Sequence, residues 1–538
     1  MQALSLRRRH AGLALALGAL SALAQAQFDP SKVVAEPEAI ARQFTAPEQA
    51  FTTPGFAPGR LDLTTHAEVF GFLDALAARS DRIVVDTVGR SQQGRAMALA
   101  VLSGPRGVDA RLPTVLLLAQ QHGNEPAGGE AALVLAQSLA TDRSSWLDRV
   151  NVLIMPRANP DAAERFMRET ANRIDLNRDH LLLRTPESQA IARVVQRYAP
   201  QVVLDLHEFT VAGRWVGKFG AVMRADALLQ AATVGNLSPA VQQAQGRYLA
   251  LARHALEAAG HRVDDYHTAS ADPKDQTVSM GGVNVDTGRN VGGLRNAISV
   301  LLETRGIGLG RAHLARRVQS HVVASLALIE AAANDGDALL RLQQAAGRSA
   351  SEQACSGTMA VAVRQTEQQR RLSFLDARSG EPREVEVPWR SSLQLSVERE
   401  RARPCGYLIG GGEQLAVQRL RALGVEVQTL GPTPAPSPWT LEDYVLESEA
   451  SGQRQDARGA ISDGAGGIRQ LRVRTRPVQA VPPAGSHFVS LNQPLAALVS
   501  AALEPDSQNI FAANRLLGIA PDQLRRVVGP PPAGAVRQ

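Results

Sequence analysis

Short apolar runs alternate with helical stretches through the first 335 residues, and this alternation limits the possible folds most strongly. Apolar runs of about five residues fit strands that are buried on both faces. Helices between such strands predict an α/β fold with a mixed, largely parallel sheet flanked by helices. The runs expected to form strands are 114–119, 152–155, 202–206 and 298–302, and the expected helices include 127–139, 186–198 and 312–331.

Two helix starts are marked by capping residues. Thr64 or Thr65 precedes apolar residues at helical spacing, which is typical of a helix N-terminus. Pro186 directly follows Thr185 and occupies a first-turn position that proline tolerates well. We therefore expect a helix to begin at each point.

The length of 538 residues indicates more than one domain, because single cores stop growing near roughly 250–300 residues. Residues 27–60 contain several prolines and predict an extended lead-in, whereas 61–335 carry the alternation of strands and helices. A smaller C-terminal domain, α/β or β-rich, is expected at 345–538. No catalytic constellation is visible in that half. Within it we expect strands at 406–409, 425–430, 471–476 and 487–491, and a helix at 414–423.

The N-terminus has the order of a cleavable signal peptide. Three arginines (Arg7, Arg8 and Arg9) precede an apolar run at 11–24 and the small-residue site Ala24-Gln25-Ala26. The competing interpretation is a membrane anchor, but the run is shorter than the ~20 residues that a bilayer requires. We predict removal of residues 1–26 and a secreted or periplasmic protein with no stable membrane insertion afterwards. In an oxidising compartment, a disulfide between Cys355 and Cys405 is one option.

The charge pattern argues against nucleic acid as a partner. The formal net charge of +6 falls to +3 when the three N-terminal arginines leave with the signal peptide, which contains no acidic residue. The remaining arginines are scattered and often lie beside acidic residues, unlike the clustered basic face of a nucleic-acid-binding protein.

Two histidines and one glutamate are candidate metal ligands. His122 and Glu125 lie directly after the apolar run at 114–119, and His207 ends the run at 202–206. Because ligands collect where the strands of such a sheet end, these side chains can meet there. Two imidazoles and one carboxylate leave the fourth position of a tetrahedral zinc open, which is typical of a catalytic site. Taken singly, either histidine also fits an ordinary core or surface residue.

Five short motifs in this order resemble the zinc metallocarboxypeptidase family. The resemblance covers about residues 60–330 and implies a carboxypeptidase-like α/β fold with one Zn²⁺ per chain, held by His122, Glu125 and His207. The motifs are HGNE at 122–125, NPD at 159–161, DLNRD at 175–179, DLHEF at 205–209 and LLETRG at 301–306.

The same resemblance implies roles for the residues around the metal. Asn177 and Arg178 match the pair that binds the terminal carboxylate of the substrate, and a guanidinium fork with an amide suits that planar group. Glu303, at the end of an apolar run, matches the general base. Asp175 resembles the acid that orients a ligating histidine. Glu208 is expected to point away from the metal, because neighbouring strand residues face opposite sides.

Arg168 is similar in placement to the arginine that stabilises the oxyanion of the reaction, a role in which donors act as charge develops. Arg165 and Arg173 remain rivals for it.

One departure from the family concerns a tyrosine that is usually supplied by a flexible loop before the base. Residues 267–302 contain none, and Tyr266 is the nearest candidate for substrate binding. Arg289, Asn290 or Arg295 could instead take over part of that binding. The polar, glycine-rich segment 267–293 predicts a long, mobile loop that acts as a lid. Three arginines lie near this segment: Arg289, Arg295 and Arg305. They either bind an acidic group of the substrate or are ordinary surface charges.

The function implied is a zinc metallocarboxypeptidase that hydrolyses the C-terminal peptide bond through zinc-bound water activated by Glu303. Its substrate would be a peptide, including peptides derived from peptidoglycan. Two further functions remain open: a zinc amidohydrolase of N-acyl amino acids, similar to aspartoacylase and succinylglutamate desuccinylase, and a non-catalytic scaffold on the same fold.

Overall fold

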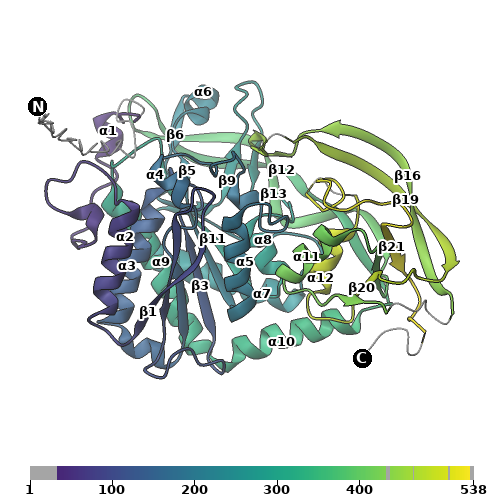
Figure 1. Ribbon diagram of the computed structural model, residues 1–538. Helices are drawn as coiled ribbons and strands as arrows, with labels where there is room; N and C mark the ends of the chain where they lie inside the picture. Colours follow the sequence, from purple (N-terminus) through teal and green to yellow (C-terminus); the bar gives the residue numbers. More distant parts are fainter. Residues whose placement is uncertain (1–32, 432–436, 465, 507–508, 533–538) are drawn as a thin grey trace, which may run out of the picture.

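The computed structural model describes residues 33–431, 437–464, 466–506 and 509–532 (Figure 1). The predicted signal peptide at 1–26 lies outside the described residues. No helix within them is long and apolar enough to cross a membrane.

A mixed, eight-stranded sheet forms the centre of the N-terminal part. Its middle strands β4, β3, β5 and β11 run parallel, β1 and β2 extend it in antiparallel fashion on one side, and β7 is antiparallel to β11. The predicted α/β architecture with a mixed, largely parallel sheet is therefore confirmed. The spatial order is β1 (Ile83–Arg90), β2 (Ala96–Leu102), β4 (Asn151–Met155), β3 (Thr114–Ala119), β5 (Val202–Thr210), β11 (Ile298–Ile307), β7 (Ala227–Ala231) and β8 (Val263–Asp265).

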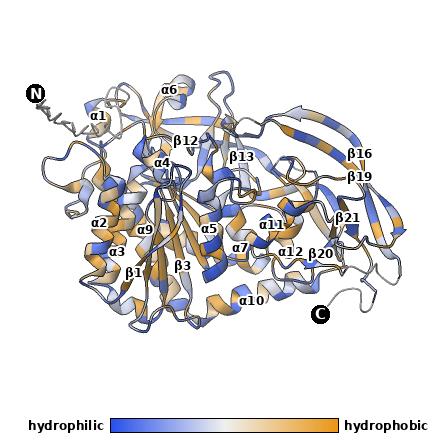
Figure 2. Ribbon diagram, in the orientation of Figure 1, coloured by the Kyte–Doolittle hydropathy of each residue, from blue (hydrophilic) through white to orange (hydrophobic). Residues whose placement is uncertain are grey.

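Helices cover both faces of this sheet, and the strands are apolar on both sides (Figure 2). Along β3, Val115 and Leu117 join one core, whereas Leu116 and Leu118 join the other. This alternation follows from the two-residue repeat of a strand. On the first face lie α2 (His66–Ala77), α3 (Pro126–Ala140), α7 (Pro239–Ala258) and α9 (Leu314–Asp335), and on the second lie α5 (Pro186–Tyr198) and α8 (Gly288–Leu294).

The predicted helix starts are confirmed. Thr65 caps α2 through a capping box: its side chain accepts from the Glu68 backbone N–H, and the Glu68 carboxylate accepts from the Thr65 backbone N–H. Thr185 caps α5, with Pro186 in the first turn. The remaining helices between residues 33 and 352 are α1 (Glu38–Ala41), η2 (Pro54–Phe56), η3 (Ser144–Asp148), α4 (Pro160–Glu164), η4 (Leu176–Arg178), α6 (Arg214–Phe219) and α10 (Asp337–Glu352).

The prediction that 267–293 is one long loop is wrong. The segment contains β9 (His267–Ala269), β10 (Val278–Met280) and most of α8, and every residue of α8 is buried. Its glycines allow close packing: a Cβ at Gly292 would lie 2.5 Å from Ser299 Oγ, and one at Gly293 would lie 2.5 Å from the Ala232 Cβ. Glycine here brings α8 against the sheet rather than loosening the chain.

A second, five-stranded sheet includes strands from both sides of residue 345. Two long strands, β12 (Thr358–Asp376) and β13 (Pro382–Ala402), form a hairpin. β12 pairs with β6 (Ala221–Met223), and β13 pairs with β10. The C-terminal half is thus joined to the N-terminal half through backbone hydrogen bonds.

The rest of the C-terminal half is built on a six-stranded sheet, as the expected β-rich structure requires (Figure 1). The predicted strand at 425–430 is only two residues long. Cys355 and Cys405 form a disulfide. The elements are β14 (Gly406–Ile409), β15 (Gln428–Thr429), β16 (Trp439–Gly452), β19 (Ile468–Ala480), β20 (His487–Ser490), β21 (Leu524–Val527), α11 (Gln414–Ala422), α12 (Ala496–Leu503) and a separate hairpin of β17 (Gln455–Asp456) and β18 (Gly459–Ala460).

Candidate active site

A cavity of about 340 Å³ opens at the carboxyl ends of β5 and β11. This is where the strands of such a sheet release their loops and where ligands collect. All eight residues predicted for the site lie at it: His122, Glu125, Arg168, Asn177, Arg178, Tyr266 and Glu303 line its wall, and His207 contacts His122 and Glu125 from β5.

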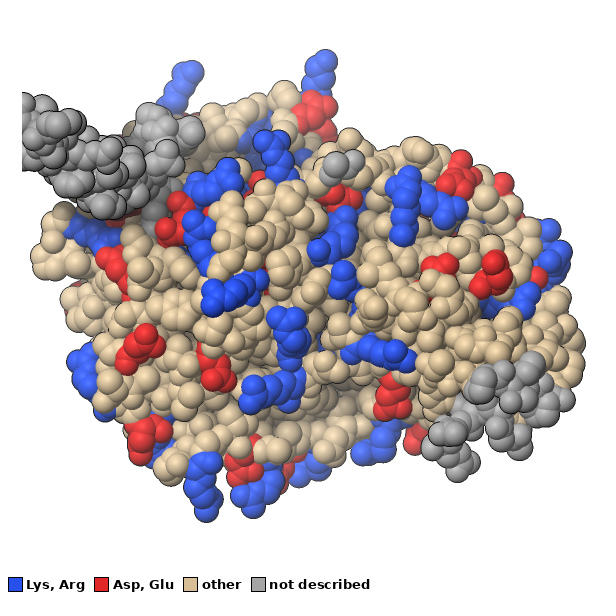
Figure 3. Space-filling view, viewed as in Figure 1, with Lys and Arg blue, Asp and Glu red and all other residues tan. Residues whose placement is uncertain are grey.

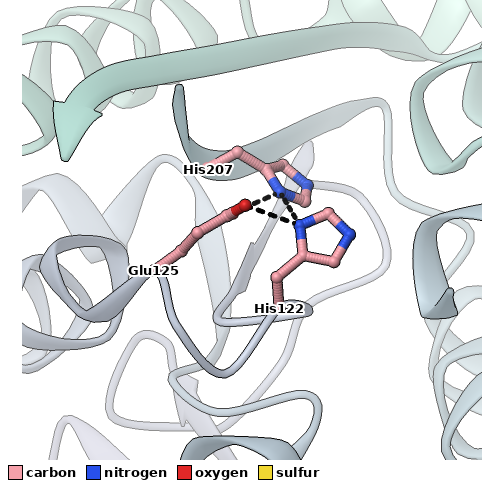
Figure 4. Close-up of side chains that lie close together, drawn as sticks. All are labelled: His122, Glu125 and His207. Atoms are coloured by element: carbon pink, nitrogen blue, oxygen red, sulfur yellow. Dashed lines mark hydrogen bonds and ion pairs between the residues drawn. The ribbon is translucent and has the colours of Figure 1, made fainter. Parts of the chain in front are cut away.

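His122, Glu125 and His207 form one buried cluster (Figure 4). Glu125 Oε1 lies 2.8 Å from His122 Nδ1, and Glu125 Oε2 lies 2.8 Å from His207 Nδ1. The two Nδ1 atoms are 3.1 Å apart. One potential ligand atom from each residue lies within 4.8 Å of the others. A donor set of two imidazoles and one carboxylate fits a catalytic zinc site with an open position.

The outer ring nitrogens of both histidines contact carboxylates. His122 Nε2 lies 3.0 Å from Asp175 Oδ1, and His207 Nε2 lies 2.7 Å from Asp205 Oδ1. Such contacts fix the ring orientation of a metal-ligating histidine and leave Nδ1 free for the metal. Asp175 was expected here. Asp205 was not, although it lies two residues before His207 on β5, so that both side chains share a face of the strand.

Replacing Asp205 with Asn is expected to weaken zinc binding by about 10- to 100-fold, because the amide no longer orients and polarises the His207 ring. Competition with a chelator of known affinity measures this change. Asp86, an acid at the far edge of the sheet in β1, serves as the control: Asp86→Asn should leave zinc affinity unchanged. Equal affinity for Asp205→Asn and wild type would remove Asp205 from the site.

Glu303 lies beside the cluster on the neighbouring strand. It is the Cα partner of His207 in the parallel pairing of β11 with β5. Burial, reinforced by the negative charge of Glu125, raises the pKa of Glu303 to about 7. Two arginines close to Glu303 in the sequence do not pair with it: Arg305 pairs with Glu36, and Arg295 donates to the backbone carbonyl of Leu423. A carboxylate in this state is well suited to accept and return a proton near neutral pH.

Arg168 is the arginine that reaches the cluster, and neither of its rivals Arg165 and Arg173 lines the cavity. Its Nη1 lies 3.4 Å from Glu125 Oε1, and its Nε and Nη2 donate to Asp175 at 3.2 and 2.8 Å. Asp175 therefore positions both Arg168 and the ring of His122.

Asn177 and Arg178 follow Asp175 in the short helix η4. The Asn177 Oδ1 atom accepts from the backbone N–H of Gly288 at 2.8 Å, which fixes the amide plane. Arg178 donates through Nη2 to Asp456 and through Nη1 to the Asn177 carbonyl, both at 2.6 Å. These two contacts hold its guanidinium at the cavity wall.

The C-terminal half, in which the sequence shows no catalytic constellation, also reaches the site, because the hairpin of β17 and β18 forms part of the cavity wall. Asp456 accepts from Arg178 and, at 2.8 Å, from Arg458 Nη2. Arg458 in turn lies 4.0 Å from Asp175. The Asp175 backbone N–H donates to the Ser462 carbonyl at 3.1 Å, so the segment that directly follows the hairpin is held by main-chain contact. Because Arg178 and Asp456 are about 280 residues apart in the chain, no local sequence pattern predicts that they meet.

Tyr266 and Arg289 both line the cavity. Burial, with the nearby charge of Glu303, raises the pKa of Tyr266 to about 12, so its hydroxyl stays protonated. Asn290 does not line the cavity and donates to the Asn284 carbonyl. Of the alternatives left open by the sequence, a role for Arg295 or Arg305 in the site is excluded, because both are bound outside it.

Glu208 has its carboxylate away from the metal cluster, as expected. It accepts from Arg317 Nε at 2.7 Å and from the backbone N–H of Ala127 at 3.0 Å. The Ala127 contact ties the carboxylate to the first turn of α3, where the positive end of the helix dipole stabilises it.

Comparison with known proteins gives matches to carboxypeptidases. Residues 69–219 match the family described as zinc carboxypeptidase. Carboxypeptidase 2 of Trichophyton rubrum is 28% identical over 491 residues, which cover 88% of each chain, and that of Trichophyton equinum is 28% identical over 485 residues, 86% of this chain and 87% of the relative. A metallo-carboxypeptidase structure from Burkholderia cenocepacia is 19% identical with a TM-score of 0.38, covering 50% of this chain and 70% of the other.

Proposed function

We propose that the chain contains a metallocarboxypeptidase domain and is a zinc-dependent exopeptidase that removes the C-terminal residue of a peptide. The match of residues 69–219 to the zinc carboxypeptidase family supports this proposal. The observation that carries the proposal is the buried cluster of His122, Glu125 and His207 with Glu303 beside it on the next strand. We assign catalysis to residues 61–335 and treat 345–538 as an accessory region that completes the cavity wall.

Three side chains would hold one zinc ion per chain: His122 and His207 through Nδ1, and Glu125 through its carboxylate. The ion, when bound, supplies a Lewis acid that polarises a carbonyl and lowers the pKa of water. Asp175 and Asp205 orient the two imidazoles, and burial keeps bulk water from competing for the ligand atoms.

Glu303 takes a proton from the attacking water on its carboxylate and returns it to the nitrogen of the leaving amine. Burial and the charge of Glu125 raise its pKa, and the bound cation opposes that shift. Arg168 donates to the oxygen that becomes negative when the carbonyl is attacked, which stabilises the transition state more than the ground state. Asn177 and Arg178 bind the terminal carboxylate and place the last peptide bond against Glu303.

The N-terminal residues, rather than the site, indicate where the protein acts and which peptides it can reach. We propose export to the cell exterior or the periplasm, on the signal-peptide pattern at 1–26. A peptide, including one derived from peptidoglycan, is then the accessible substrate.

A pair of peptides that differ only at the C-terminus tests the proposal. The zinc-loaded protein should release the last residue from the free acid, and amidation of that terminus should lower kcat/KM by at least about 100-fold, because Arg178 then has no carboxylate to bind. Quantification of the released amino acid by mass spectrometry provides the readout. Cleavage of N-acyl amino acids with no cleavage of peptides would indicate the zinc amidohydrolase. No turnover with zinc bound would indicate the scaffold.

A further inference from the structure

Several arginines line the cavity, and Figure 3 shows that Lys and Arg side chains are also spread over the outer face of the molecule rather than gathered in one patch. Arg178 and Arg458 share one carboxylate, that of Asp456. Arg289 lines the same cavity and has none: among the described residues no Asp or Glu forms an ion pair with it. A buried charge without a counter-charge is costly, and the usual solution is a partner of opposite sign.

Arg289 is held rigidly although it lacks an acid. Its residue is only 5% exposed, and Nη2 donates to the Gly282 carbonyl at 2.6 Å and to Thr233 Oγ1 at 3.4 Å. A Cβ at Gly281 would lie 2.8 Å from Nη2, so that glycine makes the space that the guanidinium occupies. Burial lowers the pKa of Arg289 to about 10, which still leaves it charged at neutral pH.

Arg289 keeps donors for a ligand. Both of its hydrogen bonds to the described residues go through Nη2, to the Gly282 carbonyl and Thr233 Oγ1. Arg178 lines the same cavity. Two arginines in one cavity match a ligand that carries two carboxylates, since each guanidinium binds one planar carboxylate well.

We propose that the enzyme prefers substrates whose C-terminal residue is acidic, with Arg178 and Asn177 binding the α-carboxylate and Arg289 binding the side-chain carboxylate of Glu or Asp. This inference rests on the proposed exopeptidase function and names its substrate class. Arg289 is thus a specificity-determining residue and takes no part in proton transfer. Arg214, a second cavity arginine without an acidic partner among the described residues, donates to the Ala269 carbonyl and is the rival for the role.

The test compares kcat/KM for N-blocked dipeptides that end in Glu, Gln, Leu or Lys. The wild-type enzyme should favour Glu over its uncharged isostere Gln by roughly 10- to 100-fold. Arg289→Gln should remove that preference and leave the rate on the Leu peptide within about threefold of wild type. Arg289→Lys, which keeps the charge, should retain part of the preference and covers the case in which the Gln variant does not fold.

Arg295 provides a matched control. It is a largely buried arginine at the end of α8, but it donates to the Leu423 carbonyl outside the cavity, so Arg295→Gln should not change the ratio of Glu to Gln cleavage. Equal cleavage of all four peptides by wild type would overturn the acidic preference and leave the exopeptidase function intact. An equal loss on all four in Arg289→Gln, or loss of the preference in Arg214→Gln instead, would overturn the role of Arg289. No cleavage of any peptide would overturn both proposals.

Discussion

Replacing Glu303 with Gln is expected to lower kcat by about 10²- to 10⁴-fold while zinc affinity stays at the wild-type level. Glu303 lies beside the ligands on β11 but is not one of them, so the amide removes the proton acceptor and leaves the donor set intact. Steady-state kinetics on a free-acid peptide, together with the zinc content by mass spectrometry, separates the loss of the base from the loss of the metal.

Glu169 is the matched control for this substitution. It also lines the cavity, but its carboxylate accepts from Ser462 Oγ at the rim, away from the cluster. Glu169→Gln should keep the rate within about threefold of wild type. Full activity in Glu303→Gln would mean that another group serves as the base.

The assignment of Glu303 as the base also predicts how kcat/KM changes with pH. Glu303 acts in its ionised form, so kcat/KM falls as the pH drops through its pKa. Burial and the charge of Glu125 raise that pKa from 4.5 to about 7, and a bound cation lowers it again. The acid limb should therefore have its midpoint between these two values, and it should be absent from the residual rate of Glu303→Gln.

The second large effect is expected at His207. Replacing it with Ala removes one of three ligands and leaves the buried carboxylates of Glu125 and Asp205 without their imidazole partner. Zinc affinity should fall by more than the roughly 100-fold that loss of an outer contact produces, and activity should fall with it. His254, an exposed histidine on α7, is the control, since His254→Ala should bind zinc and turn over normally. Unchanged zinc binding in His207→Ala would exclude this cluster as the metal site.

The parts of the fold that depend on local pattern were predictable from the sequence. β3 and α5 occupy the predicted residues, because an apolar run flanked by polar loops and a capped, periodic stretch each determine their own conformation. The ligand cluster could be predicted for a related reason: His122 follows β3, His207 lies near the end of the neighbouring strand β5, and both strands end at the same edge of the sheet.

The remaining parts depend on contacts between distant residues. Asp456 and Arg458 reach the site from the short hairpin of β17 and β18, which lies between β16 and β19 in the chain. Its position is therefore set by how those two long strands fold. The glycines of α8 look like a loop in the sequence, because composition does not reveal that Gly292 and Gly293 pack against the sheet. The orientations of Arg295 and Arg305, both near the base in sequence, are likewise set by distant partners: Leu423 and Glu36.

Zinc titration into the metal-free protein tests the central claim most directly. Activity on a free-acid peptide should rise in proportion to added zinc and reach its plateau at one equivalent per chain, because His122, Glu125 and His207 form a single three-ligand site. Full activity in the metal-free protein, or a plateau reached only at two equivalents, would contradict the assignment of this cluster as the catalytic zinc site.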